Sequence, residues 1–212
     1  NIARIELFRG NLISGGIMGK RTLDGHEHSD SELIRRCANG EIRAQEVLYK
    51  RYFSFAMSVC IRYTRDNYEA MELVNDSYMK VLGSLSDYDS SRPFKSWYGR
   101  ILVNTAIDSY RKNLKHSDSL SIDDITEAGE QEPDIEAELS ANDILKLYSH
   151  LPAQYRLTFN LFEIEGYSHE EIGQMLGITA SSSRSNLARA KKLLRELYSK
   201  HFTPVKKGHE EF

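Results

Sequence analysis

The sequence predicts an all-α protein made of two small helical domains joined by an acidic, flexible linker. Apolar residues recur at helical spacing through residues 28–115 and again through residues 144–203, and no segment keeps the alternation of a strand. Between these blocks, residues 116–143 carry ten acidic side chains and no basic one, whereas each block has a net charge of +3. A segment so acidic and free of aromatic residues buries too little apolar area to fold alone, so we expect a linker there.

Composition and motifs argue against several classes of protein. An apolar fraction of 40% and a charged fraction of 28% suit a soluble globular protein, and no apolar run is long enough to span a membrane. The sequence has no Gly-rich phosphate loop, nucleophile elbow or HExxH motif, and its seven His residues are scattered. Cys37 and Cys60 lie apart without CxxC spacing. We therefore expect no enzymatic activity, no metal, no cofactor and no disulfide, in a reducing cytoplasm.

The two ends of the chain are expected to lie outside the helical domains. Residues 1–27 are interpreted as a poorly ordered N-terminal extension, within which Met18 is a candidate native start. Residues 204–212 are interpreted as a C-terminal tail. The expected domains are thus residues 28–115 and residues 144–203.

Four helices are expected in the first domain. Ser29 or Ser31 can cap a short helix that ends at Asn39–Gly40. The three that follow are predicted over residues 41–63, 68–85 and 93–112. Pro93 opens the last of them, where its missing N–H does no harm. The apolar positions that predict the two middle helices are Ala44, Val47, Leu48, Phe55, Val59, Ile61, Met71, Val74, Tyr78, Val81 and Leu82.

The last of these helices combines aromatic rings with cations. Its sequence, PFKSWYGRILVNTAIDSYRK, sets four rings among four basic side chains, with Asn104 and Asp108 inside its apolar body. One interpretation is a buried core with a solvated basic face. The other is a platform for unstacked bases, which take ring faces for stacking and cations for phosphates. The residue pattern alone leaves both open.

The second domain carries a helix-turn-helix pattern. A helix is expected over residues 144–151, and another runs from Pro152 to about Glu165, where Gly166 stops it. Ser168 and Glu171 then form a capping-box pattern at the start of a short helix. Gly177 makes the turn, and Thr179 caps a longer helix that runs past Leu197 with Leu187, Ala190 and Leu194 on one side. No acidic residue occurs from Ile172 to Arg195, which is typical of a recognition helix, although a basic solvated helix in a three-helix bundle is the alternative.

Both blocks resemble the extracytoplasmic-function (ECF) sigma factors of bacterial RNA polymerase. Residues 44–112 resemble region 2 of this family in LYKRY (48–52), RYTRDNYEAMELVNDSYMKVL (62–82) and the aromatic-basic stretch at 93–112. Residues 151–195 resemble region 4 in LPAQYRLTFNLFEIEGYSHEEIGQMLGI and RSNLARAKKLLR. The resemblance implies a region 2 helical bundle and a region 4 helix-turn-helix bundle. It also implies a function: a sigma factor that binds core RNA polymerase and directs initiation at −35 and −10 promoter elements.

The resemblance implies that the aromatic-basic helix and the loop before it recognise the −10 element as its strands separate. An unpaired base enters a pocket, and stacking or edge hydrogen bonds offset the cost of flipping it. The residues implied at this site are Phe94, Lys95, Trp97, Tyr98, Arg100, Asn104, Asp108, Arg111 and Lys112. Asn104 is the main candidate for a base contact, whereas Trp97 also fits a core position and Asp108 an internal bond.

For the −35 element, the resemblance implies contacts from the recognition helix. The implied residues are Thr179, Ser181, Ser182, Arg184, Ser185, Asn186, Arg189 and Lys192. The sequence departs from the family here, because Ser181, Ser182 and Ser183 stand where most members have Gly-Thr-Val. We expect Ser183 to weaken packing of this helix, and Asn186, in place of a common arginine, to flatten the salt dependence of DNA binding.

The segment EAMELVNDSYMKVL matches the family's surface for the clamp of the largest polymerase subunit. The implied contacts are Leu73, Asn75, Asp76, Tyr78 and Lys80, with Leu73 and Tyr78 partly packed. The implied partners are core RNA polymerase, promoter DNA as duplex and as melted non-template strand, and an anti-sigma factor. The implied location is the cytoplasm, with nucleoid association when bound to polymerase.

Two other functions stay open at this point. A helix-turn-helix regulator that binds duplex DNA without polymerase would explain the second domain but not the aromatic-basic helix. An all-α adaptor that meets only proteins would treat every basic face as solvated. Protein-dependent initiation by core polymerase distinguishes the sigma factor from both.

Overall fold

The structure, a computed structural model, describes residues 29–117 and 146–202. These two ranges form helices joined by short turns, and neither contains a strand. This confirms the all-α prediction. The predicted N-terminal extension, acidic linker and C-terminal tail fall outside the described residues, apart from residues at their edges.

The first domain follows the predicted order of elements. It consists of α2 (Asp30–Ala38), α3 (Ile42–Cys60), α4 (Asn67–Ser84), the 3₁₀ turn η1 (Leu85–Asp87) and α5 (Phe94–Ser117). Ser29 caps α2 by accepting a hydrogen bond from the backbone N–H of Glu32, and Asp66 caps α4 through that of Glu69. Each cap satisfies an N–H that the first helical turn leaves unpaired, so the helix starts are set locally.

The core of the first domain lies between α3, α4 and α5. Leu48, Val74, Val81 and Leu102 have no exposed surface, and each helix contributes one or two of them. Full burial of an aliphatic side chain stabilises a fold by about 1.5–3 kcal/mol, so this cluster dominates the packing of the domain. Met71 is an exception to the predicted core, because its side chain is 36% exposed.

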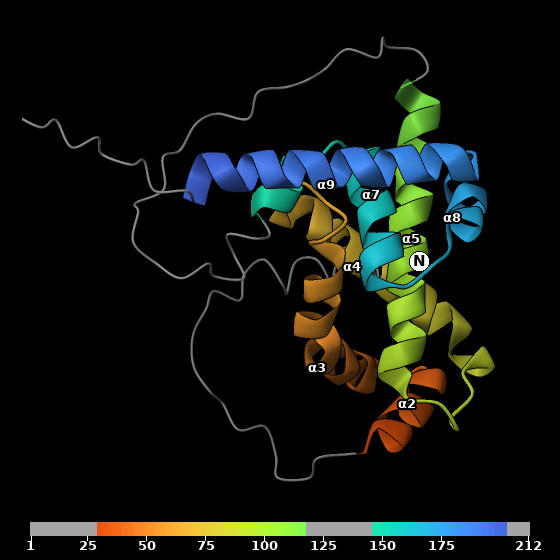
Figure 1. Cartoon of the computed structure of the whole chain (residues 1–212). Helices are drawn as coiled ribbons and strands as arrows, with labels where there is room; N and C mark the ends of the chain where they lie inside the picture. Colours follow the sequence, from red (N-terminus) through yellow and green to blue (C-terminus); the bar gives the residue numbers. More distant parts are fainter. Residues whose placement is uncertain (1–28, 118–145, 203–212) are drawn as a thin grey trace, which may run out of the picture.

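The second domain contains one element that the sequence did not predict. It consists of α7 (Ala153–Phe159), the π-helical turn η2 (Asn160–Ile164), α8 (His169–Leu176) and α9 (Ala180–Phe202), and residues 146–149 are also helical. The single helix expected from Pro152 to Glu165 is therefore α-helical for two turns and π-helical at its end. In Figure 1, α9 begins beside α8 and runs across α7.

Backbone and side-chain details fix the helix-turn-helix. Ser168 and Glu171 form the predicted capping box at the start of α8. Gly177 ends α8 with a φ of 69°, in the left-handed region that favours glycine. A Cβ at Gly173 would lie 2.8 Å from the carbonyl oxygen of Ile178, so only glycine lets the turn come this close to α8.

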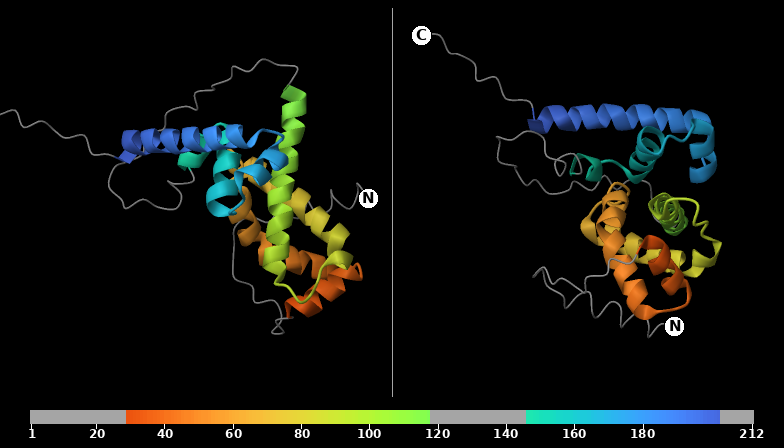
Figure 2. Two further views of the ribbon diagram at one scale, coloured as in Figure 1. Left: turned by 45° about the vertical axis from the view of Figure 1, so that its right-hand side comes forward. Right: turned by 90° about the horizontal axis from the view of Figure 1, so that it is seen from below.

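The two domains share one apolar cluster. Leu157 and Leu161 from the second domain, with Ile172 and Leu176 of α8, belong to the same buried cluster as the core of the first. The views in Figure 2 agree that α8 lies beside α5, the helix predicted to hold the melted DNA strand. Arg111 of α5 donates to the carbonyl oxygen of Gln174 in α8 at 3.1 Å. The domains are therefore in contact along the side of α5.

Candidate nucleic-acid interface

One side of α5 is polar and exposed. Arg100, Asn104, Asp108 and Arg111 follow one another at spacings of three or four residues, which places them on one face of the helix, and all four are exposed. Asp108 forms an ion pair with Lys80 of α4 at 2.9 Å. The side chain of Asn104 has no hydrogen-bond partner among the described residues, so its amide can both donate to and accept from a base edge.

Two aromatic residues predicted for DNA contact lie in the core instead. Phe94 is 3% exposed and Tyr98 is 1% exposed, and they pack against each other and against the ring of Tyr52. Burial raises the pKa of the Tyr98 phenol, in keeping with an apolar setting. This corrects the prediction for both residues, because buried rings cannot stack on bases.

Trp97 and Lys95 border that aromatic cluster. Trp97 is half-buried and packs against the rings of Phe94 and Tyr88. Lys95 is exposed, with its ammonium 4.8 Å from the centre of the Phe55 ring. Trp97 is thus only partly in the core, and its role in DNA binding stays a prediction.

The N-terminal half of α9 presents the side chains predicted for duplex recognition. Thr179 caps the helix by accepting from the backbone N–H of Ser182 at 3.0 Å. The exposed residues of the predicted set are Thr179, Ser181, Ser182, Arg184, Ser185, Arg189 and Lys192. Arg184 lies 3.7 Å from Glu170, and Arg189 donates to the hydroxyl of Tyr155 at 3.3 Å. Asn186 is buried, which corrects its predicted role as a base contact, since its amide points into the domain.

The predicted polymerase-binding face of α4 is only partly at the surface. Asp76 and Lys80 are exposed, and Asn75 is half-buried and accepts from the hydroxyl of Tyr49 at 2.8 Å. Leu73 and Tyr78 are buried in the core, so the structure corrects their assignment to the interface. The burial of these two follows the helical period of α4, whose other face carries the acidic and basic residues.

Sequence reasoning missed exposed apolar residues on α4. Tyr68 is 70% exposed and Met79 is 51% exposed. Tyr68 lies two helical turns before Asp76 and Met79 less than one turn after it, so the three share a face. Large apolar side chains surrounded by charge are typical anchors of a separable protein interface. Most apolar residues of α4 recur at the spacing of a buried helix face. Tyr68 and Met79 occur among them in the sequence, so the sequence alone did not distinguish these two exposed side chains from core residues.

Comparison with known proteins identifies both domains. Residues 48–115 match the family described as Sigma-70 region 2, and residues 141–194 match that described as Sigma-70, region 4. Among curated relatives, the RNA polymerase sigma-H factor of Pseudomonas aeruginosa is 25% identical over 180 residues, 79% of this chain and 93% of the relative. The ECF RNA polymerase sigma-E factor of Haemophilus influenzae is 24% identical over 177 residues, 78% of this chain and 93% of the relative. The chain belongs to the ECF sigma factors.

As a sigma factor, the protein directs transcription from specific promoters. ECF sigma factor SigM of Bacillus subtilis is 27% identical over 157 residues, 72% of this chain and 94% of that one. A solved structure of the sigma factor RpoE with the anti-sigma factor NepR from Bartonella quintana aligns with a TM-score of 0.45 and 23% identity, over 73% of this chain and 96% of that one.

Buried Ser183 of this sigma factor has a side-chain partner in the neighbouring helix. Ser183 is fully buried, and its hydroxyl lies 2.9 Å from Nδ1 of His169 in α8. The His169 ring in turn stacks on Phe162, with 4.4 Å between ring centres. A hydrogen bond therefore joins the two helices at this position, and the expected weakening of the recognition helix stays a prediction.

Replacing Ser183 with Ala is expected to lower the free energy of unfolding of the sigma factor by about 1–3 kcal/mol, because a partner of the half-buried His169 ring is lost. Ser185→Ala, at an exposed position of the same helix, is the matched control and should change stability by about 0.5 kcal/mol or less. Urea denaturation followed by circular dichroism measures both. Equal effects of the two substitutions would contradict a structural role for the Ser183–His169 bond.

Cys37, Cys60 and Arg156 of the sigma factor are buried. Burial raises the pKa of the Cys37 thiol to about 11 and that of Cys60 to about 12. Burial lowers the pKa of Arg156 to about 10, and its guanidinium donates to the carbonyl oxygens of Ser149 and Leu151.

Within residues 29–117 and 146–202, no group of three His, Cys, Asp or Glu side chains could hold a metal ion. No helix in these ranges is long and apolar enough to cross a membrane.

Proposed function

We propose that this sigma factor binds the melted −10 element along α5, reads the −35 element with the N-terminal half of α9, and binds core RNA polymerase through α4. The observation that carries the proposal is the exposed polar face of α5. There Asn104, whose amide has no hydrogen-bond partner in residues 29–117 and 146–202, lies between the cations Arg100 and Arg111, within the part of the chain that matches region 2. A base edge can bond to the amide while the flanking cations neutralise phosphates of the same strand.

Support for −35 recognition comes from the exposure of the polar side chains at the start of α9. Ser181, Arg184 and Ser185 lie in the first two turns of the second helix of a helix-turn-helix, the part that enters the major groove in this motif. Arg189 and Lys192 follow along the helix and suit phosphate contacts. In this assignment residues 28–115 form the −10 domain and residues 144–203 the −35 domain, joined by the acidic segment.

For polymerase binding, we assign Asp76 and Lys80 with the exposed apolar residues Tyr68 and Met79 of the same helix. These replace the buried Leu73 and Tyr78 of the sequence prediction as apolar anchors. Nucleotide addition belongs to the polymerase, so the sigma factor itself carries out no chemistry. Membership of the ECF family further supports an anti-sigma partner and a cytoplasmic location.

The test is run-off transcription with bacterial core polymerase on a pool of promoter fragments, with and without the protein. We expect initiation from defined start sites only when the protein is present. Asn104→Ala should lower the yield by about 5-fold to 150-fold, because a good side-chain contact to a base is worth about 1–3 kcal/mol. Asn113→Ala is the matched control, since Asn113 is also exposed on α5 and lies about half a turn away from Asn104 around the helix axis.

The outcomes separate the alternatives. Initiation that is lost in Asn104→Ala and kept in Asn113→Ala supports the assignment of the −10 site. Equal yields from both variants would contradict it. Absence of initiation together with specific duplex binding by the protein alone would favour a regulator, and absence of both would favour an adaptor.

A further inference from the structure

A tight turn of residues 89–92 leads from η1 into α5. The backbone N–H of Arg92 donates to the carbonyl oxygen of Asp89 at 3.1 Å, which closes the turn. The carboxylate of Asp89 accepts from the backbone N–H of Ser91 at 2.9 Å and forms an ion pair with Arg92 at 3.5 Å. All four residues of the turn are exposed. The turn therefore presents its backbone and side chains to solvent in a defined shape.

The side chain of Tyr88 ties this turn to the core of the first domain. Its hydroxyl donates to the carbonyl oxygen of Arg92 at 2.6 Å. Its ring packs edge-on against Phe94, with 5.5 Å between ring centres, and against Trp97, with 5.1 Å between centres. Burial raises the pKa of the Tyr88 phenol, so the hydroxyl stays protonated and can donate at neutral pH. One side chain thus joins the last residue of the turn to the rings at the start of α5.

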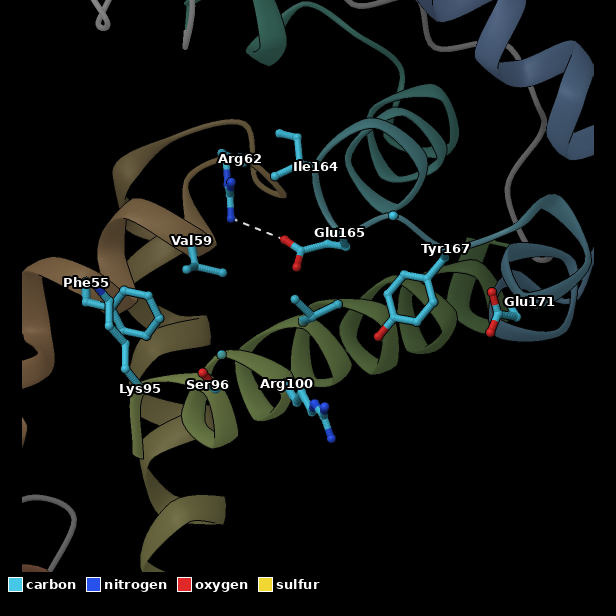
Figure 3. A pocket seen from close by; sticks show the side chains of 13 residues that line it. Phe55, Val59, Arg62, Lys95, Ser96, Arg100, Ile164, Glu165, Tyr167 and Glu171 are labelled. Atoms are coloured by element: carbon cyan, nitrogen blue, oxygen red, sulfur yellow. Dashed lines mark hydrogen bonds and ion pairs between the residues drawn. The ribbon is translucent and has the colours of Figure 1, made fainter. Parts of the chain in front are cut away.

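The turn lies next to cations at the start of α5. Figure 3 shows Lys95 and Ser96 on the first turn of α5 and Arg100 on the second. Lys95 and Arg100 are exposed, and neither forms an ion pair with a carboxylate in residues 29–117 and 146–202. Exposed cations suit the phosphates of a single strand. A strand that follows α5 from Asn104 toward its first residue therefore passes these cations and reaches the turn.

The turn and Asn104 are too far apart to contact one base. Phe94, the first residue of α5, is ten positions before Asn104, which is about 15 Å along the helix axis. Successive nucleotides in one strand of a duplex rise by only about 3.4 Å. The turn and Asn104 therefore face different bases of a strand that lies along α5.

The tie through Tyr88 affects how well the turn can distinguish bases. A base edge is recognised by donors and acceptors at fixed positions, and hydrogen bonds weaken steeply when their distance or angle changes. Without the Tyr88 hydroxyl, the turn keeps its internal hydrogen bonds from Asp89 but loses the bond that fixes the carbonyl of Arg92 to the core. Its groups can then shift relative to α5, and different bases become more nearly equal in binding.

The family resemblance implies that the loop before α5 takes part in recognition of the −10 element, and the structure adds which side chain sets its shape. We propose that Tyr88 is the positioning residue of this loop: its hydroxyl holds residues 89–92 in the shape that selects one unpaired base of the −10 element. Tyr88 acts through the turn and makes no DNA contact of its own. The inference rests on the proposed function, because the turn has a base to select only if the melted strand follows α5.

The test compares Tyr88→Phe with the wild type in run-off transcription by the holoenzyme. The substitution removes only the hydroxyl and keeps the ring that packs on Phe94 and Trp97. A promoter found with the wild type is prepared with each of the four bases at each −10 position, and the initiation rates give the base preference at that position. Tyr110→Phe is the matched control, because Tyr110 is also half-buried in the first domain and its hydroxyl has no hydrogen-bond partner among the described residues.

We expect Tyr88→Phe to lower the ratio of rates between the best and the second-best base about fivefold at one −10 position, which is the effect of one lost hydrogen bond. That position differs from the one at which Asn104→Ala lowers the preference. Asp89→Ala removes the hydrogen bond inside the turn by a different route and should lower the preference at the same position as Tyr88→Phe. Tyr110→Phe should leave every preference unchanged.

Three results would overturn the inference. They are an unchanged base preference in Tyr88→Phe, a loss of initiation by the same factor from every promoter version, which a merely structural role would give, and a loss of preference at the position read by Asn104. Absence of initiation with the wild type would contradict the proposed function and this inference together. Initiation with the wild type and unchanged preferences in Tyr88→Phe would contradict the inference alone, so the two failures are distinguishable.

Discussion

Replacing Leu102 with Ala is expected to lower the free energy of unfolding by about 2–5 kcal/mol. Leu102 has no exposed surface and lies in the middle of α5, packed into the core between α3 and α4. Removing its isobutyl group loses transfer free energy and leaves a cavity, which the surrounding helices fill only in part because protein interiors are close-packed. A loss of this size is a large fraction of the stability of a small domain.

Urea denaturation measured by circular dichroism tests this expectation. Leu114→Ala is the matched control, because Leu114 belongs to the same helix and is 44% exposed. Its loss should be about 0.5 kcal/mol or less. If Leu102→Ala and Leu114→Ala unfolded at similar urea concentrations, α5 would not pack into the first domain through Leu102.

The second large effect is expected on DNA binding. Replacing both Arg184 and Arg189 with Gln should weaken binding of the holoenzyme to a promoter fragment by about 2 kcal/mol or more, since each removes a cation from the N-terminal half of α9. Each lost phosphate contact also reduces the slope of log affinity against log salt by about 0.9. Of the two, Arg189 is the one assigned to a phosphate, so the slope should flatten by about 0.9.

The control for this pair changes the net charge of the protein by the same amount as the test pair. Arg35→Gln/Arg43→Gln removes two exposed cations from α2 and α3 in the first domain, away from α9. Filter binding or anisotropy over a series of salt concentrations gives the affinity and the slope. If the control flattened the slope as much as the test pair, the effect would come from overall charge, and the proposed −35 contacts would be wrong.

Local signals predicted most of the fold. Ser29, Asp66–Asn67, Ser168 with Glu171, and Gly177 mark helix boundaries because each acts on backbone groups within a few residues. The sequence carries such signals directly, and the resulting helices begin and end close to their predicted positions. The π turn was missed because the apolar pattern was interpreted with one helical period throughout.

The candidate site was predicted less completely, because its details depend on contacts between distant segments. Rings and cations alternate along α5, and only packing against Tyr52 decides that Phe94 and Tyr98 are buried. The bond from His169 to Ser183 joins different helices, and the hydrogen bond from Arg62 to Glu165 joins different domains. Such pairs leave no spacing pattern in a single sequence. Asn104 stands out locally as a polar residue in an apolar run, and it lies exposed on α5, but its role as a base contact stays a prediction.

The π-helical turn at Asn160–Ile164 also has a consequence for how relatives of this protein are compared. A helix that lacks one residue at this point would return to regular α geometry, and the side chain aligned with Glu165 would point away from the first domain. The feature that separates chains with and without the hydrogen bonds from Arg62 and Tyr63 to Glu165 would then be a one-position gap in the alignment. Two relatives could keep every residue of the contact and still differ in whether the contact forms.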